Sequence, residues 1–363
     1  MSFRPRLFTA HGLTALALAA LGLAAVTASC TPSGSAIDPR FHGAAKNALE
    51  QLEVQKHFVP HAGERRIRTT RVLPTGQSVV SDYRESIRVD AQGAYQQECF
   101  EVLASPYGDA GAFMDRMNSL EGFLYRYRDF HVHDADLLLE NYVVLQFGVL
   151  ITVARQSCYT VQLERRDDPY STDPIVRWDL AIDTHSGLVL QWQRSVDGVL
   201  TDEGVYEWIE YNPSTPFVAH VPSNSERSFD AGEERDLFDY ALTTPTLLPL
   251  GFQRIERARV VDPSDDSVWL KETFSDGVEV AFFLYKEIEP AATATTARSS
   301  KLGTTVRGGG ASSSTVSTGG SELVSVESGD VGITQFVGPE RTAVVAGRIG
   351  SDDRRWMLES ALF

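Results

Sequence analysis

Alternation of apolar and polar residues runs through most of this chain and predicts β-strands along much of its length. The clearest stretch is 176–211, where three alternating runs are separated by polar turns at 183–187 and at Asp197-Gly198. Asp-Gly pairs between alternating runs are typical of tight hairpin turns. The pattern predicts three consecutive antiparallel strands.

The rest of the first half predicts strands with a few helices. Apolar residues recur at helical spacing over 41–54, between Pro39 and Pro60, and again over 110–127. The remaining extended runs are 65–73, 78–89, the segment around Cys99, 149–153 and 159–163. We therefore expect one antiparallel domain over 41–211.

The last third predicts a smaller antiparallel sheet. An extended run at 252–261 is followed by a second at 268–275, a turn at Ser275-Asp276-Gly277, and a third run in which Val278, Val280 and Phe282 alternate with other residues. Two hairpins in succession, then strands at 332–335 and 341–347 and a closing helix, define a domain at 240–363.

Two polar stretches interrupt these patterns. Residues 212–239 carry three prolines among polar residues and predict an interdomain linker. Residues 291–321 consist almost entirely of Ala, Thr, Ser and Gly, and cannot bury enough apolar surface to order themselves. We interpret them as a disordered loop between strands of one sheet.

The N-terminus predicts an export leader at 1–29. Arg4 and Arg6 precede an apolar run at 13–26, which is too short to cross a bilayer as a helix. Small residues before Cys30 resemble the bacterial lipobox, in which the cysteine becomes the lipidated N-terminus, and 30–40 would be the tether. Thr27 stands where an aliphatic residue is usual, so cleavage after Ala28 without lipidation is the alternative.

The charge balance limits the partners. The formal net charge of the 363 residues is −16, and loss of the two leader arginines brings it to −18. Such a surface disfavours nucleic acid and anionic lipid headgroups, and favours a basic protein segment.

Few residues suggest chemistry. Export permits a disulfide between Cys99 and Cys158, and two buried free thiols are the alternative. No nucleophile motif is present, and the spacings His131-Val132-His133 and His57 to His61 are too weak to predict a metal site. We predict no enzyme activity, metal or cofactor. Four residues on neighbouring strands would line an apolar cavity or, the interpretation we favour for the tryptophans, fill a core: Trp178, Leu190, Trp192 and Trp208.

Two segments carry a family resemblance. The Leu248-Pro249-x-Gly251-Phe252 turn, followed by Phe274-Ser275-Asp276-Gly277 and a Val-rich strand, resembles the C-terminal domain of the MucB/RseB family of periplasmic sigma-factor regulators. The cadence over 178–211 looks like the LolA/LolB/LppX half-barrels, which that family carries at its N-terminus. An ordinary Asp-Gly turn is the alternative explanation of the first motif.

The resemblance implies a fold and a function. The fold class would be α+β, with a LolA-like antiparallel half-barrel and covering helices before the smaller sheet and its C-terminal helix. The function would be a non-enzymatic regulator at the periplasmic face of the cell envelope, which senses lipid or lipoprotein and contacts a membrane-bound, anti-sigma-type partner. A lipid or lipoprotein carrier is the alternative. We expect the partner to contact the C-terminal domain at Phe274, Val280, Phe282 and Tyr285.

Overall fold

The computed structural model describes residues 39–55, 59–72, 78–105, 108–119, 128–166, 174–214, 227–228, 244–261, 267–287, 312–318, 321–328, 331–338 and 341–362. The predicted leader at 1–29, Cys30 and nearly all of the tether lie outside these residues, as does most of the linker at 212–239. Residues 37–363 belong to one contact unit. None of the described helices is both long and apolar enough to cross a membrane.

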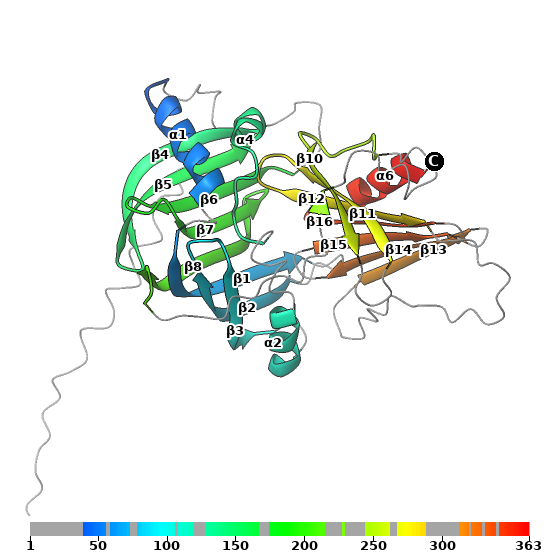
Figure 1. Cartoon of the computed structure of the whole chain (residues 1–363), viewed down its shortest axis with the longest axis horizontal. Coiled ribbons are helices and arrows are strands. Elements are labelled where there is room, and N and C mark those ends of the chain that lie inside the picture. The colour runs from blue at the N-terminus through cyan, green and yellow to red at the C-terminus, as the bar shows by residue number, and fades with distance from the viewer. Residues whose placement is uncertain are drawn as a thin grey trace, which may run out of the picture. The chain divides into compact units, whose positions relative to one another are not determined.

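The first half of the chain is an eight-stranded antiparallel sheet in the order β3-β2-β1-β8-β7-β6-β5-β4 (Figure 1). Each stretch predicted as a strand contains one, although β4 begins earlier than expected. The sheet curls, so that β4 comes near β8. Its strands are β1 (His61–Val72), β2 (Ser78–Val89), β3 (Tyr95–Ala104), β4 (Tyr142–Val153), β5 (Gln156–Arg165), β6 (Val176–Asp183), β7 (Val189–Val196) and β8 (Val199–Tyr211).

Three helices accompany this sheet: α1 (Pro39–Gln55), α2 (Ala110–Ser119) and α4 (Ala135–Asn141). Leu49 and Leu52 of α1 and Leu138 of α4 are buried in the same core cluster as Trp178. Helix α2 packs on β3 and adds Phe113 to that cluster. The main cover is therefore α1 with α4. Helix α4 was not predicted, because seven residues are too few for helical periodicity to be distinctive.

The second half is another eight-stranded antiparallel sheet, in the order β13-β14-β15-β16-β12-β11-β10-β9. Helix α6 (Ser351–Leu362) covers one side, where Met357 and Leu358 pack with Phe274, Phe283 and Val345. The predicted closing helix is thus confirmed. The strands are β9 (Arg227–Ser228), β10 (Gln253–Val261), β11 (Val268–Ser275), β12 (Val280–Glu287), β13 (Ser312–Thr318), β14 (Ser321–Ser328), β15 (Val331–Val337) and β16 (Arg341–Gly347).

The prediction of a disordered loop over 291–321 is wrong for part of that range. Ser312–Thr318, inside the range 291–321, forms β13 and pairs residue for residue with β14. Composition misled here because a strand at the edge of a sheet is held by backbone hydrogen bonds, which Ser and Thr make as well as apolar residues do. Strand β9 likewise lies within the predicted linker and pairs with β10. Residues 291–311 lie outside the described part of the chain.

Candidate functional site

The two turns that carry the sequence resemblance meet the first sheet at the end of α4. The Asn141 side-chain Nδ2 donates to the carbonyl oxygens of Gly251, at 3.0 Å, and Asp276, at 3.1 Å. The backbone N–H of His133 donates to the carbonyl oxygen of Gly277 at 2.9 Å. We call residues 275–279 the docking turn, because they attach the second sheet to the first.

The close approach of neighbouring chain segments explains why glycine occupies positions 251 and 277. Gly277 has a φ of +104°, and a Cβ added there would lie 2.4 Å from the backbone nitrogen of Leu138. Gly251 has a φ of +78°, and its Cβ would collide with the Asn141 side chain. Glycine is needed at these positions for its conformational freedom and for its lack of a side chain.

A buried carboxylate lies at the centre of the docking turn. One oxygen of Asp276 accepts from the backbone N–H groups of Val278, at 3.1 Å, and Glu279, at 2.8 Å. The other accepts from the Tyr142 hydroxyl at 2.9 Å, and the Arg165 guanidinium is 3.9 Å away. Burial, with the nearby charge of Glu279, raises the pKa of Asp276 to about 6. Burial and then Asp276 raise the pKa of Tyr142 well above its ordinary value.

A second contact and an apolar plug complete this joint. The Arg194 guanidinium on β7 lies 2.7 Å from Glu279 and 3.5 Å from Asp202. Val278, between the two polar anchors, is buried in the core cluster of the first sheet together with Leu138 and Trp178. The docking turn therefore contributes both a buried ion pair and a core residue to the other half.

Four charged side chains form a buried cluster inside the first sheet. Arg65 contacts Glu85 at 2.6 Å and Asp129 at 2.8 Å, and Arg128 contacts the same two carboxylates at 2.6 and 2.8 Å. The Gln97 amide adds a hydrogen bond to Glu85 at 2.7 Å. Burial alone would lower the pKa of Arg65, but Asp129 and Glu85 outweigh it and raise the value. The cluster is neutral in sum, as a buried site requires.

Sequence patterns missed this cluster, although one signal was available. Arg65 stands two residues before the buried Ile67, and Glu85 two residues after the buried Tyr83, so alternation places both charges on inward-facing positions. A charge at an inward position implies a buried partner of opposite sign. The partner on the loop, Arg128, could not be identified without the fold.

A small cavity of about 40 Å³ lies beside the charged cluster. Arg65, Asp129, His61 and Tyr206 give it polar walls, and Leu52 and Trp192 are among its apolar lining residues. The His61 Nε2 is 3.1 Å from the Tyr206 hydroxyl, and burial lowers the pKa of His61 to about 4, so its ring is neutral at pH 7. At about 10–15 Å³ per water the cavity holds a few waters, whereas small-molecule pockets span roughly 300–1,000 Å³.

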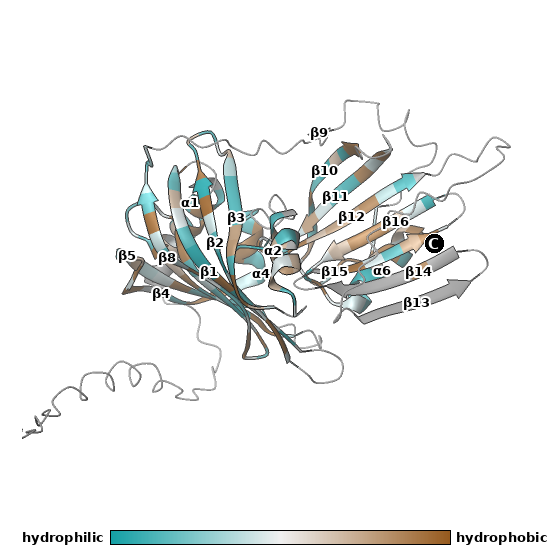
Figure 2. Ribbon diagram, turned by 90° about the horizontal axis from the view of Figure 1, so that it is seen from below, coloured by the Kyte–Doolittle hydropathy of each residue, from teal (hydrophilic) through white to brown (hydrophobic). Residues whose placement is uncertain are grey.

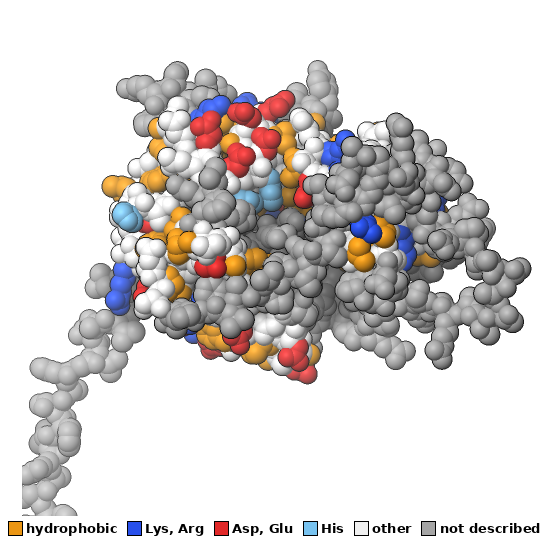
Figure 3. All heavy atoms as spheres, viewed as in Figure 1, with side chains coloured by type: hydrophobic (Ala, Val, Ile, Leu, Met, Phe, Trp, Pro, Cys, Tyr) orange, Lys and Arg blue, Asp and Glu red, His pale blue; other side chains and the backbone are white. Residues whose placement is uncertain are grey.

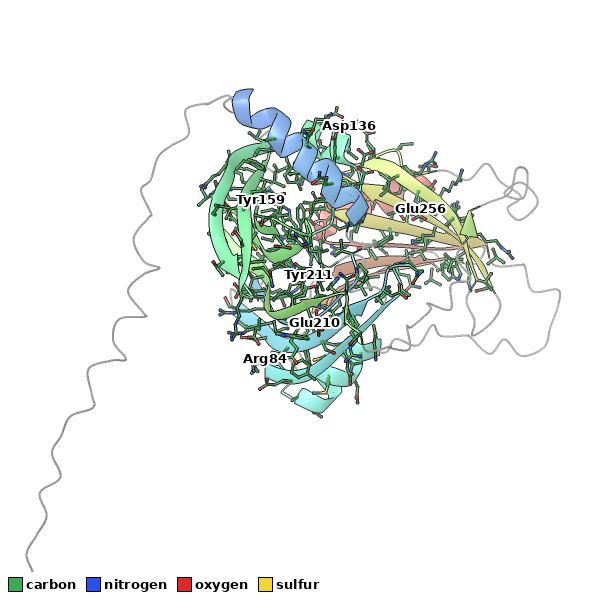
Figure 4. All side chains as sticks on the ribbon, turned by 60° about the vertical axis from the view of Figure 1, so that its left-hand side comes forward. Arg84, Asp136, Tyr159, Glu210, Tyr211 and Glu256 are labelled. Carbon is green, nitrogen blue, oxygen red and sulfur yellow. The ribbon has the colours of Figure 1, made fainter. Side chains whose placement is uncertain are left out.

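The four predicted cavity residues do not share one cavity. Trp178 and Trp192 lie with their ring centroids 6.1 Å apart in the core cluster, and Leu190 is buried in a separate cluster with Cys158. Trp208 is 48% exposed, so its predicted inward position is wrong. Only Trp192 borders the cavity. The interpretation that we favoured, in which the tryptophans fill a core, holds for Trp178 and Trp192. Figure 4 shows side chains filling the space beneath α1.

The predicted disulfide is wrong. Cys99 on β3 and Cys158 on β5 are buried free thiols in different core clusters. Strands β3 and β5 are separated by β2, β1, β8, β7 and β6 in the sheet, whereas a disulfide requires Cα atoms within about 7 Å. Burial raises the pKa of each thiol to about 11.

The predicted partner-contact residues are also wrong as a surface. Phe274, Val280, Phe282 and Tyr285 are all buried, with exposed fractions of 0%, 5%, 4% and 7%. Phe274 and Tyr285 pack in the core beneath α6. Alternation showed which residues share a face, but it did not show that both faces of β11 and β12 would be covered.

The histidine spacings considered for a metal site are not joined by further metal ligands within the described ranges. His131 and His133 lie with ring centroids 4.6 Å apart. Within the described ranges, no three His, Cys, Asp or Glu side chains are grouped as metal ligands would be. His57 lies outside those ranges.

The chain is similar to MucB. The crystal structure of MucB matches with a TM-score of 0.43 and 14% identity, covering 88% of this chain and 97% of that chain. Two structures of MucB with MucA, one of them from Pseudomonas aeruginosa, match over the same shares at 14% identity with TM-scores of 0.41 and 0.40. No family model and no curated protein matches the chain.

Proposed function

We propose that this chain is a non-enzymatic regulatory binding protein of the cell envelope that contacts a membrane-bound, anti-sigma-type signalling protein. The observation that carries the proposal is the docking turn. The residues that resemble the MucB/RseB family, at 248–252 and 274–278, are those that attach the two sheets to each other. A protein with two joined β-sheets can present a surface to a partner while a ligand acts on the other half.

Sensing of lipid or lipoprotein is part of this proposal. The space beneath α1 is filled, and the cavity of about 40 Å³ is too small for an acyl chain. A ligand in the first half would therefore have to displace the α1 and α4 cover. Such a displacement would reach the docking turn directly, since Leu138 of α4 contacts the position of Gly277.

The surface charge indicates the chemistry of the partner. Acidic side chains gather over α1 and α4 in Figure 3, where Glu50, Glu53, Asp136 and Glu140 are exposed and Lys46 lies among them. With a net charge of −16 for the chain, a basic partner segment would be drawn to such a surface. Its association should slow as salt rises, because the Debye length falls from about 10 Å at 0.1 M to 3 Å at 1 M.

Crosslinking in the native host tests the proposal. Photo-reactive residues are placed singly at Glu53, Trp356 and Ile333 of the full chain, and at buried Phe274 as the control. Capture of one single-pass membrane protein from at least one exposed position, and not from Phe274, is expected. Absence of any such protein from all three exposed positions would contradict the proposal.

The carrier alternative predicts a different result. Extraction of the purified chain with organic solvent should yield stoichiometric lipid if the chain carries lipid, and crosslinks should then go to lipoproteins. Attachment to the membrane is tested by intact mass. Acyl chains on Cys30 are expected, and a native N-terminus at Ser29 without lipid would contradict the predicted anchor.

A further inference from the structure

The outer edge of the first sheet is an uncharged apolar strand. Strand β4 ends the sheet next to β5, and no Asp, Glu, Lys, Arg or His occurs from 141 to 154. Leu150 is 69% exposed, Val149 47%, Leu145 41% and Ile151 36%. We call these four residues the β4 strip, and Figure 2 colours the strand brown for its hydropathy.

Exposure here is unusual in two respects. Soluble proteins protect edge strands with charged residues, most often Lys, or with proline, and β4 has neither over 142–153. Val149, Leu150 and Ile151 are consecutive, so side chains on both sides of the strand reach solvent. Pairing with β5 is irregular between Phe147 and Leu150, where Gly148 has a φ of +92°, and this bulge turns the strip outward.

We infer that the β4 strip inserts into the apolar boundary of a lipid bilayer. Its exposed large side chains are aliphatic, whereas protein interfaces favour Trp, Tyr and Arg. The strip is neutral, so it has no charge complementarity with the basic partner proposed above. The edge N–H and C=O groups of β4 cannot be left in hydrocarbon. The side chains therefore enter the acyl boundary while the strand backbone stays in the hydrated headgroup layer.

The position of α1 supports a bilayer as the occupant. Helix α1, which begins at Pro39, packs against β4 (Figure 1). Cys30 is nine residues before Pro39, a reach of at most about 30 Å. Acyl chains at Cys30 would hold the strip within reach of the same membrane and fix the orientation of the body. This orienting role rests on the proposed anchor, whereas insertion of the strip does not.

Vesicle flotation without the anchor tests the insertion. The protein is the chain from residue 30 with Cys30→Ser, which retains the whole contact unit 37–363 and removes both the leader and the site of acylation. Binding to phosphatidylcholine vesicles is expected, equal at 0.05 M and 0.5 M NaCl, and no stronger when phosphatidylglycerol is included. Val149→Glu with Leu150→Glu should lower the partition coefficient at least tenfold, because an apolar contact is replaced by two charges.

Val199→Glu with Leu200→Glu is the matched control. Val199 is 54% and Leu200 38% exposed, but both lie in the β7–β8 hairpin, so two charges there should leave vesicle binding unchanged. Equal melting temperatures of the three proteins establish that the strip variant is folded. No binding to either vesicle, or equal loss in both variants, would overturn the inference. So would concentration-dependent dimers without lipid that the strip variant abolishes, because β4 would then be a self-association edge.

Discussion

Asp276 is held by four groups, and its setting makes it a titrating residue of the joint. Its pKa near 6 in the folded protein lies above the ordinary value of 3.8, because burial and Glu279 disfavour the charged form. The folded state therefore binds this proton more tightly than the unfolded state. The resulting stability is fully present below about pH 4 and is lost as pH rises through 6.

Asp276→Asn should remove this dependence. An amide keeps an acceptor for the N–H groups of Val278 and Glu279 but has no charge to bury. Relative to the native chain, the variant should gain about 3 kcal/mol of unfolding free energy between pH 4 and pH 7. Urea unfolding of both proteins across this range measures the difference, in which the titration of His61 cancels. A difference that stays constant with pH would contradict the assignment.

Gly277→Ala should destabilise the chain much more than Gly198→Ala. Both glycines have positive φ, +104° and +76°, which costs a residue with a side chain about 1–2 kcal/mol. A Cβ at Gly198 meets nothing within 4 Å, whereas one at Gly277 meets the Leu138 backbone at 2.4 Å. We expect more than about 3 kcal/mol for Gly277→Ala by urea unfolding. Equal losses would show that the close approach is relieved elsewhere.

At the scale of elements, two deletions test whether β13 contributes to the second sheet: one ends before β13 and the other removes it. Removing 302–311 should change the free energy of unfolding by less than about 1 kcal/mol, since loop-closure entropy depends only weakly on length. Strands β12 and β13 run parallel, so the connection crosses four strand spacings, about 19 Å, and about 20 Å along the strands, or about 28 Å in all. The retained residues 288–301 reach about 45 Å, which is enough.

Extending the deletion to 318 removes β13 and exposes the edge of β14. This longer deletion should lower the melting temperature and cause concentration-dependent association, measured by light scattering. Identical behaviour of the two deletions would show that β13 contributes nothing to the sheet.

At the scale of the whole molecule, the docking turn should make the two sheets unfold together. Val278 is a core residue of the first sheet although it belongs to the second half of the chain, so the core of the first sheet is incomplete without the second. Val278→Asp should bury an unpaired charge at the joint and split one calorimetric transition into two. Val199→Asp, at an exposed position, is the control. A single transition in the Val278 variant would mean that other contacts couple the halves.

The sequence by itself determined the strands, their turns and the two motifs, because these depend on neighbouring residues. Alternation with period two follows from the pleat, and Gly187, Gly198 and Gly277 occupy turns with positive φ. Those signals placed the strands at 176–211 and the hairpin around Gly277. Residues 312–318 were not predicted to form a strand, because composition describes side chains, whereas an edge strand is held by its backbone hydrogen bonds.

Only the tertiary structure decided which distant residues meet. Cys99 and Cys158 lie on well-predicted strands, yet five strands separate them in the sheet. Phe282 was predicted to contact a partner, yet both faces of its strand are covered and it is buried. Glu85 forms ion pairs with Arg65 and Arg128, and Val278 packs in the core of the first sheet, because strand order and curvature bring these residues together. Sequence spacing carries no information about strand order, so pairings across the sheets had to come from the fold.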